Sequence, residues 1–266
     1  MTDHAFDRFK AAQREGWAHF APMALVTTAP AARLVWHAGI RPGDRVLDVA
    51  CGTGVVAVTA ARLGATVTGL DLTPELLAVA RDNARTAGVD IQFIEGDCER
   101  IGFESEAFDV VVSQYGHMFA PRPDVAIGEM LRVLRKDGTI AFSTWPPELF
   151  VGRLFTMIAR YMPPPAGVPP TTLWGEPAVV RERLGSHVRD IRFDRDTMLV
   201  PSLSPQHSCQ GSERTAGPII ALVERLRDSA PETLELFRRE YEALAAEYFA
   251  DNIVRQGYLL TRATKT

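Results

Sequence analysis

The chain contains 266 residues, of which 46% are hydrophobic and 23% are charged, and its formal net charge is −4. This composition is typical of a globular protein, and the length suits one α/β core with insertions. Lysine and arginine form no run, so the sequence offers no basic face for nucleic acid, whose binding requires neutralised phosphates. No stretch of about 18 uncharged apolar residues is present, so we expect no membrane-spanning helix.

The cysteines, Cys51, Cys98 and Cys209, are odd in number and have no metal-ligand spacing. We therefore expect neither a disulfide framework nor a bound metal, and a reducing cytoplasm fits best. Residues 1–16 are polar and charged, unlike a secretory signal. No feature of the sequence indicates an oligomeric state.

Between residues 45 and 144, short apolar runs alternate with helical patterns, which is typical of a parallel sheet with crossover helices. The clearest helix covers Pro74–Gly88: Thr73 can cap it, Pro74 suits its first turn and Gly88 can end it. The predicted strands are Arg45–Ala50, Thr66–Leu70, Ile91–Glu95, Phe108–Gln114 and Thr139–Thr144. The other predicted helices are Val55–Leu63 and Val125–Leu134.

The pattern changes after Trp145, where prolines and helical segments become frequent. Pro201–Pro218 is rich in Ser, Gly and Pro, so we predict a loop there. Because the last predicted strand needs the sixth beside it, the helices between them form an insertion, either as extra packing or as a substrate cover. The predicted elements are helices at Leu149–Tyr161 and Glu176–Leu184, two helices within Ile219–Ala250 broken near Pro231, and strands at Val188–Val200 and Gly257–Ala263.

A glycine turn follows the first predicted strand in the sequence VLDVACGTGVVA. Asp48 lies in the strand, and Gly52 and Gly54 then turn the chain into a helix. Glycine permits a positive φ and lets a ligand approach the backbone, and the helix N-terminus offers free N–H groups. Many dinucleotide-binding proteins share this pattern, so it does not specify the ligand by itself.

Acidic residues also follow the next two strands. Asp71 ends the second strand in GLDL, where a carboxylate can accept hydrogen bonds from both hydroxyls of a ribose. Asp97 and Cys98 follow the third strand in IEGDC, a position that suits the edge of an adenine. Each acid alone could be a solvated loop carboxylate or a helix cap. Because both stand at the carboxyl ends of successive strands, where open α/β sheets bind ligands, we favour a ligand site.

The segments VLDVACGTG, GLDLTPELL, GDCERIGF, FDVVVSQYG and EMLRVLRKDGTIAFSTW resemble, in order and spacing, the motifs of class I S-adenosylmethionine-dependent methyltransferases. The resemblance is greatest to the ubiquinone and menaquinone C-methyltransferase branch and covers about residues 30–145. It implies an α/β, Rossmann-like fold: a seven-stranded, mostly parallel sheet with an antiparallel last strand, helices on both faces and helical insertions over the substrate cleft. It also implies S-adenosyl-L-methionine as cofactor, S-adenosyl-L-homocysteine as product and no metal.

Carried over residue by residue, the resemblance assigns the cofactor contacts to the ends of four strands. The implied contacts are Asp48, Ala50, Gly52 and Gly54 for the methionine moiety, Asp71 for the ribose, Leu72, Asp97 and Cys98 for the adenine, and Ser113 and Gln114 for the methyl end. Ala57 replaces the third glycine of the usual pattern, a departure that this family tolerates.

Methyl transfer from a sulfonium needs an aligned nucleophile and exclusion of water, and a general base only where the acceptor must lose a proton. His117, just past the fourth strand, is the best-placed candidate base, with a packing histidine as the plainer alternative. Trp17, His19 and Phe20 form part of an N-terminal helical pattern that either packs on the core or covers the cofactor. The residues expected at the surface of the predicted loop are His207 and Cys209.

The sequence thus predicts one methyltransferase domain, residues 1–266, that methylates carbon or oxygen of a small, partly hydrophobic organic acceptor. Its expected parts are a helical cover (1–40), a cofactor-binding core (41–145) and helical insertions (146–175 and 201–250). One alternative is an NAD(P)-dependent oxidoreductase, although that class usually keeps the first strand apolar where Asp48 stands here. A second alternative is a non-catalytic S-adenosylmethionine-binding protein, which the same motifs would fit.

Overall fold

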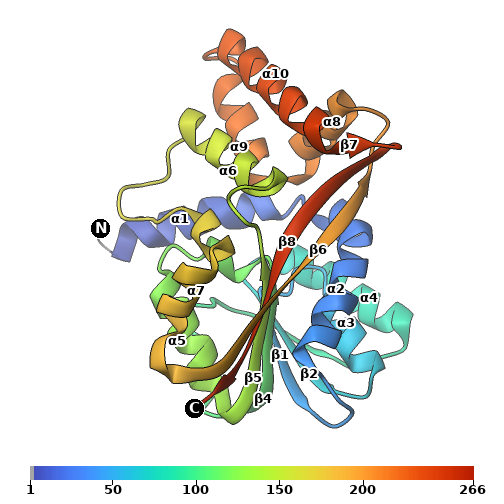
Figure 1. Cartoon of the computed structure of the whole chain (residues 1–266), viewed down its shortest axis with the longest axis vertical. Coiled ribbons are helices and arrows are strands. Elements are labelled where there is room, and N and C mark those ends of the chain that lie inside the picture. Colours follow the sequence, from blue (N-terminus) through green and yellow to red (C-terminus); the bar gives the residue numbers. More distant parts are fainter. Residues whose placement is uncertain (1–2) are drawn as a thin grey trace.

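A computed structural model describes residues 3–266. Within that range the chain forms an eight-stranded sheet of order β3-β2-β1-β4-β5-β8-β6, with β7 paired to β8 (Figure 1). β1 to β5 are parallel, and β8 is antiparallel to both β5 and β6. The strands are β1 (Arg45–Val49), β2 (Thr66–Asp71), β3 (Gln92–Glu95), β4 (Phe108–Gln114), β5 (Leu134–Thr144), β6 (Val188–Pro201), β7 (Phe249–Ala250) and β8 (Ile253–Lys265). The predicted mostly parallel sheet with an antiparallel last strand is confirmed, and the two-residue β7 is additional.

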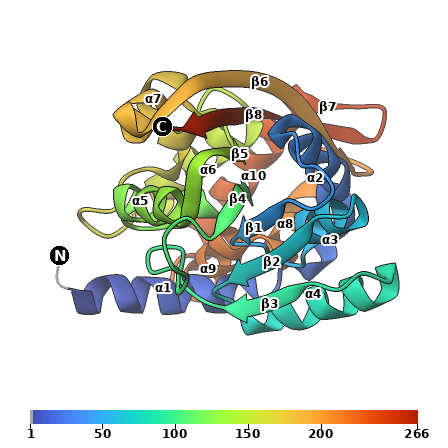
Figure 2. The same cartoon turned by 90° about the horizontal axis from the view of Figure 1, so that it is seen from below.

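Helices cover both faces of the sheet, as predicted. Figure 2 shows α2, α3 and α4 on one face and α5 and α7 on the other. The remaining helices gather at the carboxyl ends of the parallel strands, where Figure 1 places α6, α8, α9 and α10 above the sheet and α1 across it. The helices are α1 (Asp3–Trp17), α2 (Ala24–Ala38), α3 (Val55–Arg62), α4 (Pro74–Ala87), α5 (Pro123–Val133), α6 (Phe150–Tyr161), α7 (Pro177–Leu184), α8 (Pro205–Thr215), α9 (Gly217–Leu226) and α10 (Pro231–Tyr248). None of them is both long and apolar enough to cross a membrane.

The hydrophobic core lies between the sheet and its two helical layers. Val46, Leu47 and Val49 of β1 are completely buried, as expected for a central parallel strand covered on both faces. Among the described side chains, the buried hydrophobic cluster begins at Ala31, so α1 lies outside it. The sheet and its flanking helices therefore form this cluster without a buried hydrophobic side chain from the described part of α1.

The predicted loop at 201–218 is wrong, because α8 occupies most of it. The Ser204 side chain accepts a hydrogen bond from the His207 backbone N–H at 3.1 Å, and Pro205 stands in the first turn. Cys209, expected at the surface, is only 3% exposed, whereas His207 is exposed as expected. The N-terminal cap and the burial of Cys209 thus accompany a helix in a segment whose composition disfavours one. The prediction that the Thr73 side chain caps α4 is also wrong, since Thr73 stands at the N-cap position but its side chain makes no capping hydrogen bond.

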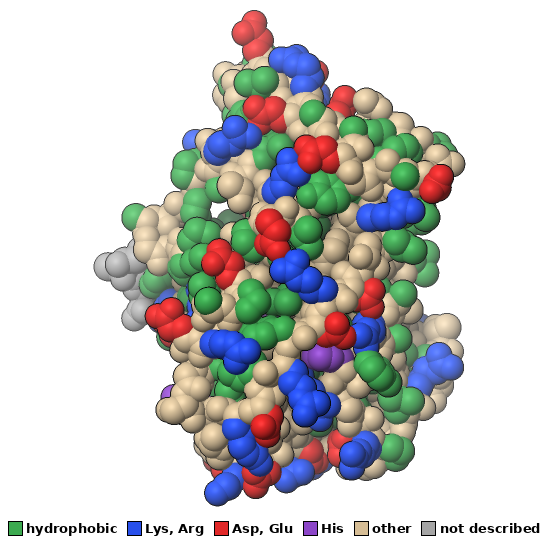
Figure 3. Space-filling model, viewed as in Figure 1, with side chains coloured by type: hydrophobic (Ala, Val, Ile, Leu, Met, Phe, Trp, Pro, Cys, Tyr) green, Lys and Arg blue, Asp and Glu red, His purple; other side chains and the backbone are tan. Residues whose placement is uncertain are grey.

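β6 and β8 form a long ribbon that carries the helices α8 to α10 (Figure 1). β5 pairs with β8 only from Leu259 to Thr264. Between Arg255 and Tyr258, β8 pairs with β6 alone within the described sheet. β6 is the edge strand, and charged side chains of both signs are interspersed on the face that Figure 3 shows. Charges along an exposed edge oppose pairing with another chain.

Candidate functional site

A cavity opens at the carboxyl ends of β1 to β4, beneath α1 and the helices that follow β5. This is the edge at which open α/β sheets bind ligands, because their turning loops leave free backbone groups there. The lining residues from the strand ends and their loops include Asp48, Ala50, Cys51, Gly52, Asp71, Leu72, Asp97, Cys98, Gln114, Tyr115 and Gly116. Of the predicted cofactor residues, Gly54 and Ser113 do not line the cavity.

The glycine turn between β1 and α3 combines two different uses of glycine. Gly52 has a φ of 54°, and a Cβ placed on it would meet only Leu76 at 4.0 Å, so its free side faces open space. Gly54 has a φ of 77°, but a Cβ there would lie 3.1 Å from both Ala80 and the Phe93 ring. Gly52 is therefore the point where a ligand can approach the backbone, and Gly54 allows the turn to pack on α4 and β3.

Asp48 is a buried carboxylate with one unused oxygen. It is 1% exposed, its Oδ2 accepts a hydrogen bond from the Ala57 N–H at 3.0 Å, and its Oδ1 has no partner among the described residues. Burial raises the pKa of this carboxyl well above its usual value. A buried acceptor without a partner is costly, and one that lines a cavity fits a ligand carrying a hydrogen-bond donor or a positive charge.

Asp71 is held rigidly at the end of β2. Its Oδ2 accepts from the Gly52 N–H at 2.7 Å and its Oδ1 from the Thr73 N–H at 2.8 Å. Burial raises its pKa, although both backbone hydrogen bonds act in the opposite direction. Each carboxylate oxygen still has a free lone pair, so a pair of ligand hydroxyls could bind without displacing either N–H.

Asp97 is joined to the N-terminal helix, which the sequence did not indicate. Lys10 of α1 donates to Asp97 Oδ2 at 2.6 Å and also to Glu99, and Glu99 in turn accepts from Arg122. Lys10 is 8% exposed and lines the cavity beside Asp97 and Cys98. α1 is therefore attached by an ion-pair network to the loop after β3, and no local pattern around Lys10 could have revealed that partner.

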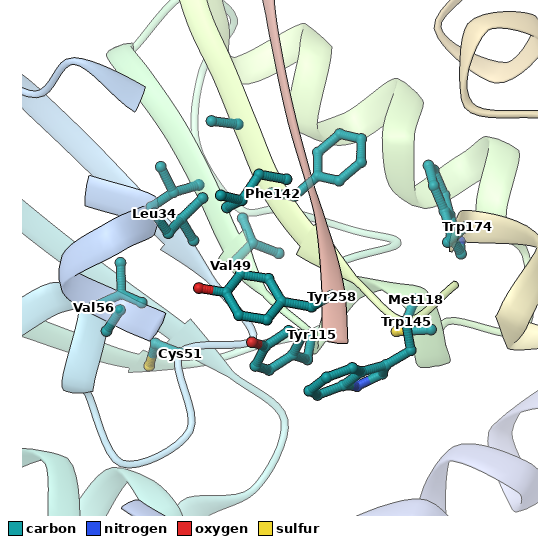
Figure 4. Close-up of a cluster of buried hydrophobic side chains, with 14 of the residues drawn as sticks. Leu34, Val49, Cys51, Val56, Tyr115, Met118, Phe142, Trp145, Trp174 and Tyr258 are labelled. Atoms are coloured by element: carbon teal, nitrogen blue, oxygen red, sulfur yellow. The ribbon is translucent and has the colours of Figure 1, made fainter. Parts of the chain in front are cut away.

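The end of β4 contacts the glycine turn closely. A Cβ on Gly116 would lie 2.4 Å from the Ala50 Cβ, so only glycine fits there. Tyr115 has a φ of 60°, and its ring stacks on that of Trp145 with a centroid distance of 4.0 Å. Figure 4 shows the two side chains beside each other. Gln114 donates to the Thr27 carbonyl at 3.0 Å, while its Oε1 is buried without a partner among the described residues. Tyr115 and Gly116 were not predicted as site residues.

Ser113 and His117 do not line the cavity. Ser113 is completely buried and accepts from the His117 N–H at 3.1 Å. The His117 ring is also completely buried, with its centroid 4.6 Å from Phe142 and 4.7 Å from Trp174. It does not line the cavity, so its position contradicts the predicted role as general base and agrees with the packing alternative.

Burial lowers the pKa of His117 from its ordinary 6.5 to about 3. The unfolded chain therefore binds this proton more readily, so stability is complete above pH 6.5 and falls as the pH falls toward 3. We expect His117 to reduce the free energy of unfolding by roughly 2 kcal/mol between pH 8 and pH 5. His117→Leu should remove that dependence, measured by urea unfolding at both pH values. An unchanged pH dependence in the variant would contradict this account.

The wall opposite the strand ends is apolar and comes from segments far apart in the sequence. Trp17 lies 4.7 Å from Phe119 and 5.7 Å from Phe20, measured between ring centroids. α1 packs on α9 where Gly16 meets Gly217, since a Cβ on Gly16 would lie 3.2 Å from the Gly217 Cα. His19 is exposed. The apolar lining residues include Trp17, Phe20, Phe119, Trp145, Phe150, Val151, Leu154, Phe155, Pro218 and Ile219.

Comparison with known proteins gives concordant matches. The sequence model of the family described as "Methyltransferase domain" matches residues 47–142. Rv1403c, an uncharacterized protein of Mycobacterium tuberculosis, is 39% identical over 234 residues, which cover 87% of this chain and 85% of its own. A ubiquinone biosynthesis O-methyltransferase of Paracidovorax citrulli is 42% identical over 116 residues, 42% of this chain and 49% of its own.

The fold is shared with a solved Bacillus halodurans protein that is provisionally described as a methyltransferase. The TM-score is 0.61 at 20% sequence identity, covering 89% of this chain and 99% of that one. The sheet, glycine turn and cavity define a Rossmann-like protein with a candidate ligand cavity at the strand ends. The chain belongs to the class I S-adenosylmethionine-dependent methyltransferases. These matches favour that family over the oxidoreductase alternative.

Proposed function

We propose that the enzyme transfers a methyl group to carbon or oxygen of a small, partly hydrophobic organic acceptor. The observation that carries this proposal is the two-sided cavity. Its sheet side presents the polar loops after β1 to β4, and its opposite side is apolar and aromatic. A ligand pocket with a largely apolar lining and a few placed polar groups is suited to a small organic molecule.

The residues at the strand ends fit S-adenosylmethionine. When bound, this cofactor supplies a methyl group activated on a sulfonium. We assign the unpartnered Asp48 Oδ1 to its ammonium group and the Asp71 carboxylate to its ribose hydroxyls. Gly52 provides the space for close approach, and Leu72, Asp97 and Cys98 line the adenine end. In this proposal Ala50 and Gln114 contact the methionine end, whereas Gly54 and Ser113 support the loops from behind.

The remaining task of the chain is to orient the acceptor and exclude water. We propose that the cover (1–40), core (41–145) and insertions (146–175 and 201–250) act together as one domain for this purpose. Among the described residues, no histidine lines the cavity, so no histidine is assigned to proton removal. Methyl transfer from labelled S-adenosylmethionine to a panel of phenols, enols and electron-rich rings tests the proposal. Binding of S-adenosylhomocysteine without transfer to carbon or oxygen of any such compound would contradict it.

Asp71→Ala should weaken the binding of S-adenosylmethionine by about 1.5–3 kcal/mol, the cost of losing a charge-assisted acceptor. Isothermal titration of the folded variant measures this as a roughly 10- to 150-fold rise in Kd. Asp82→Ala is a suitable control, because Asp82 is an exposed carboxylate on α4 whose ion pair among the described residues is with Arg85. Unchanged affinity in folded Asp71→Ala would remove this residue from the cofactor site.

A further inference from the structure

A group of three hydroxyls interrupts the apolar wall of the cavity. The Tyr241 OH of α10 lies 2.8 Å from the Ser212 Oγ and 3.2 Å from the Ser208 Oγ, both in α8. Tyr241 is 1% exposed, and both Tyr241 and Ser212 line the cavity. The three residues come from the insertion between β6 and β8, and Figure 1 places their helices opposite the strand ends.

This cluster of three hydroxyls has unused hydrogen-bonding capacity. Three hydroxyls offer three protons and six lone pairs. Their contacts with each other, together with a 3.5 Å contact from Tyr241 to the Ser208 carbonyl, use at most three protons and two of the lone pairs. A ligand group beside Tyr241 and Ser212 could therefore donate a hydrogen bond to a free lone pair. It could also accept a hydrogen bond from a hydroxyl whose proton rotates toward it. Such adaptable pairing suits a hydroxyl or a carbonyl.

The surroundings of the three hydroxyls are aromatic and uncharged. Phe150 of α6 packs edge-on against Tyr241, with ring centroids 6.0 Å apart. The charged side chains among the described lining residues are Lys10, Arg14, Asp48, Asp71 and Asp97, which come from α1 or from the strand ends. Lys10 is paired with Asp97, and Arg14 with Glu95. An acceptor carrying a formal charge would thus find no counter-ion at the insertion wall, and burying it there would be costly.

We propose that Tyr241 and Ser212 form a recognition subsite for a hydroxyl or carbonyl group of a neutral, flat acceptor. That group is distinct from the atom that is methylated, because the subsite lies on the wall opposite the cofactor loops. The aromatic side chains contact the faces and edges of the acceptor, and the hydroxyls fix its direction in the cavity. This inference rests on the proposed function and adds to it the chemical class of the acceptor and the residues that select it.

Three probes that share one ring separate the contributions: 4-ethylphenol, ethylbenzene and 4-ethylbenzoate. Saturation-transfer NMR titrations use the full-length protein with and without S-adenosylhomocysteine. We expect 4-ethylphenol to bind about 10-fold more tightly than ethylbenzene, the value of one added hydrogen bond, and 4-ethylbenzoate to bind most weakly. Tyr241→Phe should remove the preference for 4-ethylphenol and leave the affinity for ethylbenzene unchanged. Tyr248→Phe, on the same helix but outside the cavity lining, should keep the preference.

A preference for 4-ethylphenol that survives in Tyr241→Phe would overturn the proposal, as would tightest binding of 4-ethylbenzoate. An equal loss for both neutral probes would also overturn it, because a merely structural role of Tyr241 predicts that result. Thermal stabilisation by S-adenosylhomocysteine is measured in parallel for each variant. Failure of the wild type to bind S-adenosylhomocysteine would count against the proposed function, whereas altered probe selectivity alone reports on the subsite.

Discussion

Gly52→Val is expected to abolish the binding of S-adenosylhomocysteine while the protein remains folded. The residue has a φ of 54°, which a β-branched side chain resists at a cost of roughly 1–2 kcal/mol. The larger effect is steric, because the valine would fill the open space that Gly52 leaves beside the turn. We expect Kd to rise by at least about 100-fold, equivalent to 2.7 kcal/mol, in isothermal titration.

Gly88→Val provides a matched control for backbone strain. Gly88 has a φ of 66° after α4, and a Cβ placed on it meets nothing within 4 Å. This variant should lose a similar amount of stability and retain full cofactor affinity. If both variants lost binding equally, or if Gly52→Val kept thermal stabilisation by S-adenosylhomocysteine, the glycine turn would not be the point of cofactor approach.

Deletion of residues 1–22 is expected to abolish methyl transfer and leave a cooperatively folding core. The described hydrophobic cluster begins at Ala31, so the deletion removes none of its members. The deletion removes Lys10 from Asp97 and Trp17 from the cavity wall, which opens the site to water. We expect cofactor affinity to fall about 10-fold or more, equivalent to at least 1.4 kcal/mol, by isothermal titration.

Two helix glycines give a sharper version of this test. In Gly16→Val the new side chain would clash with the Gly217 backbone and push α1 away from α9. A Cβ on Gly211 of α8, in contrast, meets nothing within 4 Å. Gly16→Val should therefore reproduce part of the effect of the deletion, and Gly211→Val should not. Hydrogen exchange with S-adenosylhomocysteine should show added protection within residues 10–30. Protection confined to residues 48–117 would mean that α1 only packs on the surface.

The core elements could be predicted because their patterns are local. Both ends of β4 coincide with the predicted Phe108–Gln114, and β1 and α4 differ from prediction by one residue. These segments pair strong periodicity with glycine and proline signals at their ends. α8 was missed because the Ser, Gly and Pro content of 201–218 favoured a loop, although Ser204 and Pro205 form a local helix start. Its buried contact with Tyr241 lies about 30 residues later, where no local pattern reveals it.

The site shows the same division between local and long-range information. The loops after β1 to β3 lie together at the predicted edge and line the cavity, because parallel strands bring their carboxyl ends to one edge. His117 follows β4 at the expected place, but its ring packs edge-on against Trp174, a residue far along the chain. Lys10 was missed for a related reason, since its partners Asp97 and Glu99 are nearly 90 residues away. Strand order can thus be predicted from sequence, whereas side-chain direction depends on the packed structure.

The ribbon of β6 and β8 has a mechanical consequence for this enzyme. Between Arg255 and Tyr258 the two strands have only each other as hydrogen-bonded neighbours in the described sheet, and two-stranded ribbons are more strongly twisted than larger sheets. Because Gly217 and Tyr241 belong to the helices that follow β6, a rotation at the base of this ribbon would displace them relative to the loops of β1 to β4. The loops of β1 to β4 are anchored in the sheet and need not move. The apolar wall of the cavity and its strand-end loops are therefore carried by different parts of the sheet.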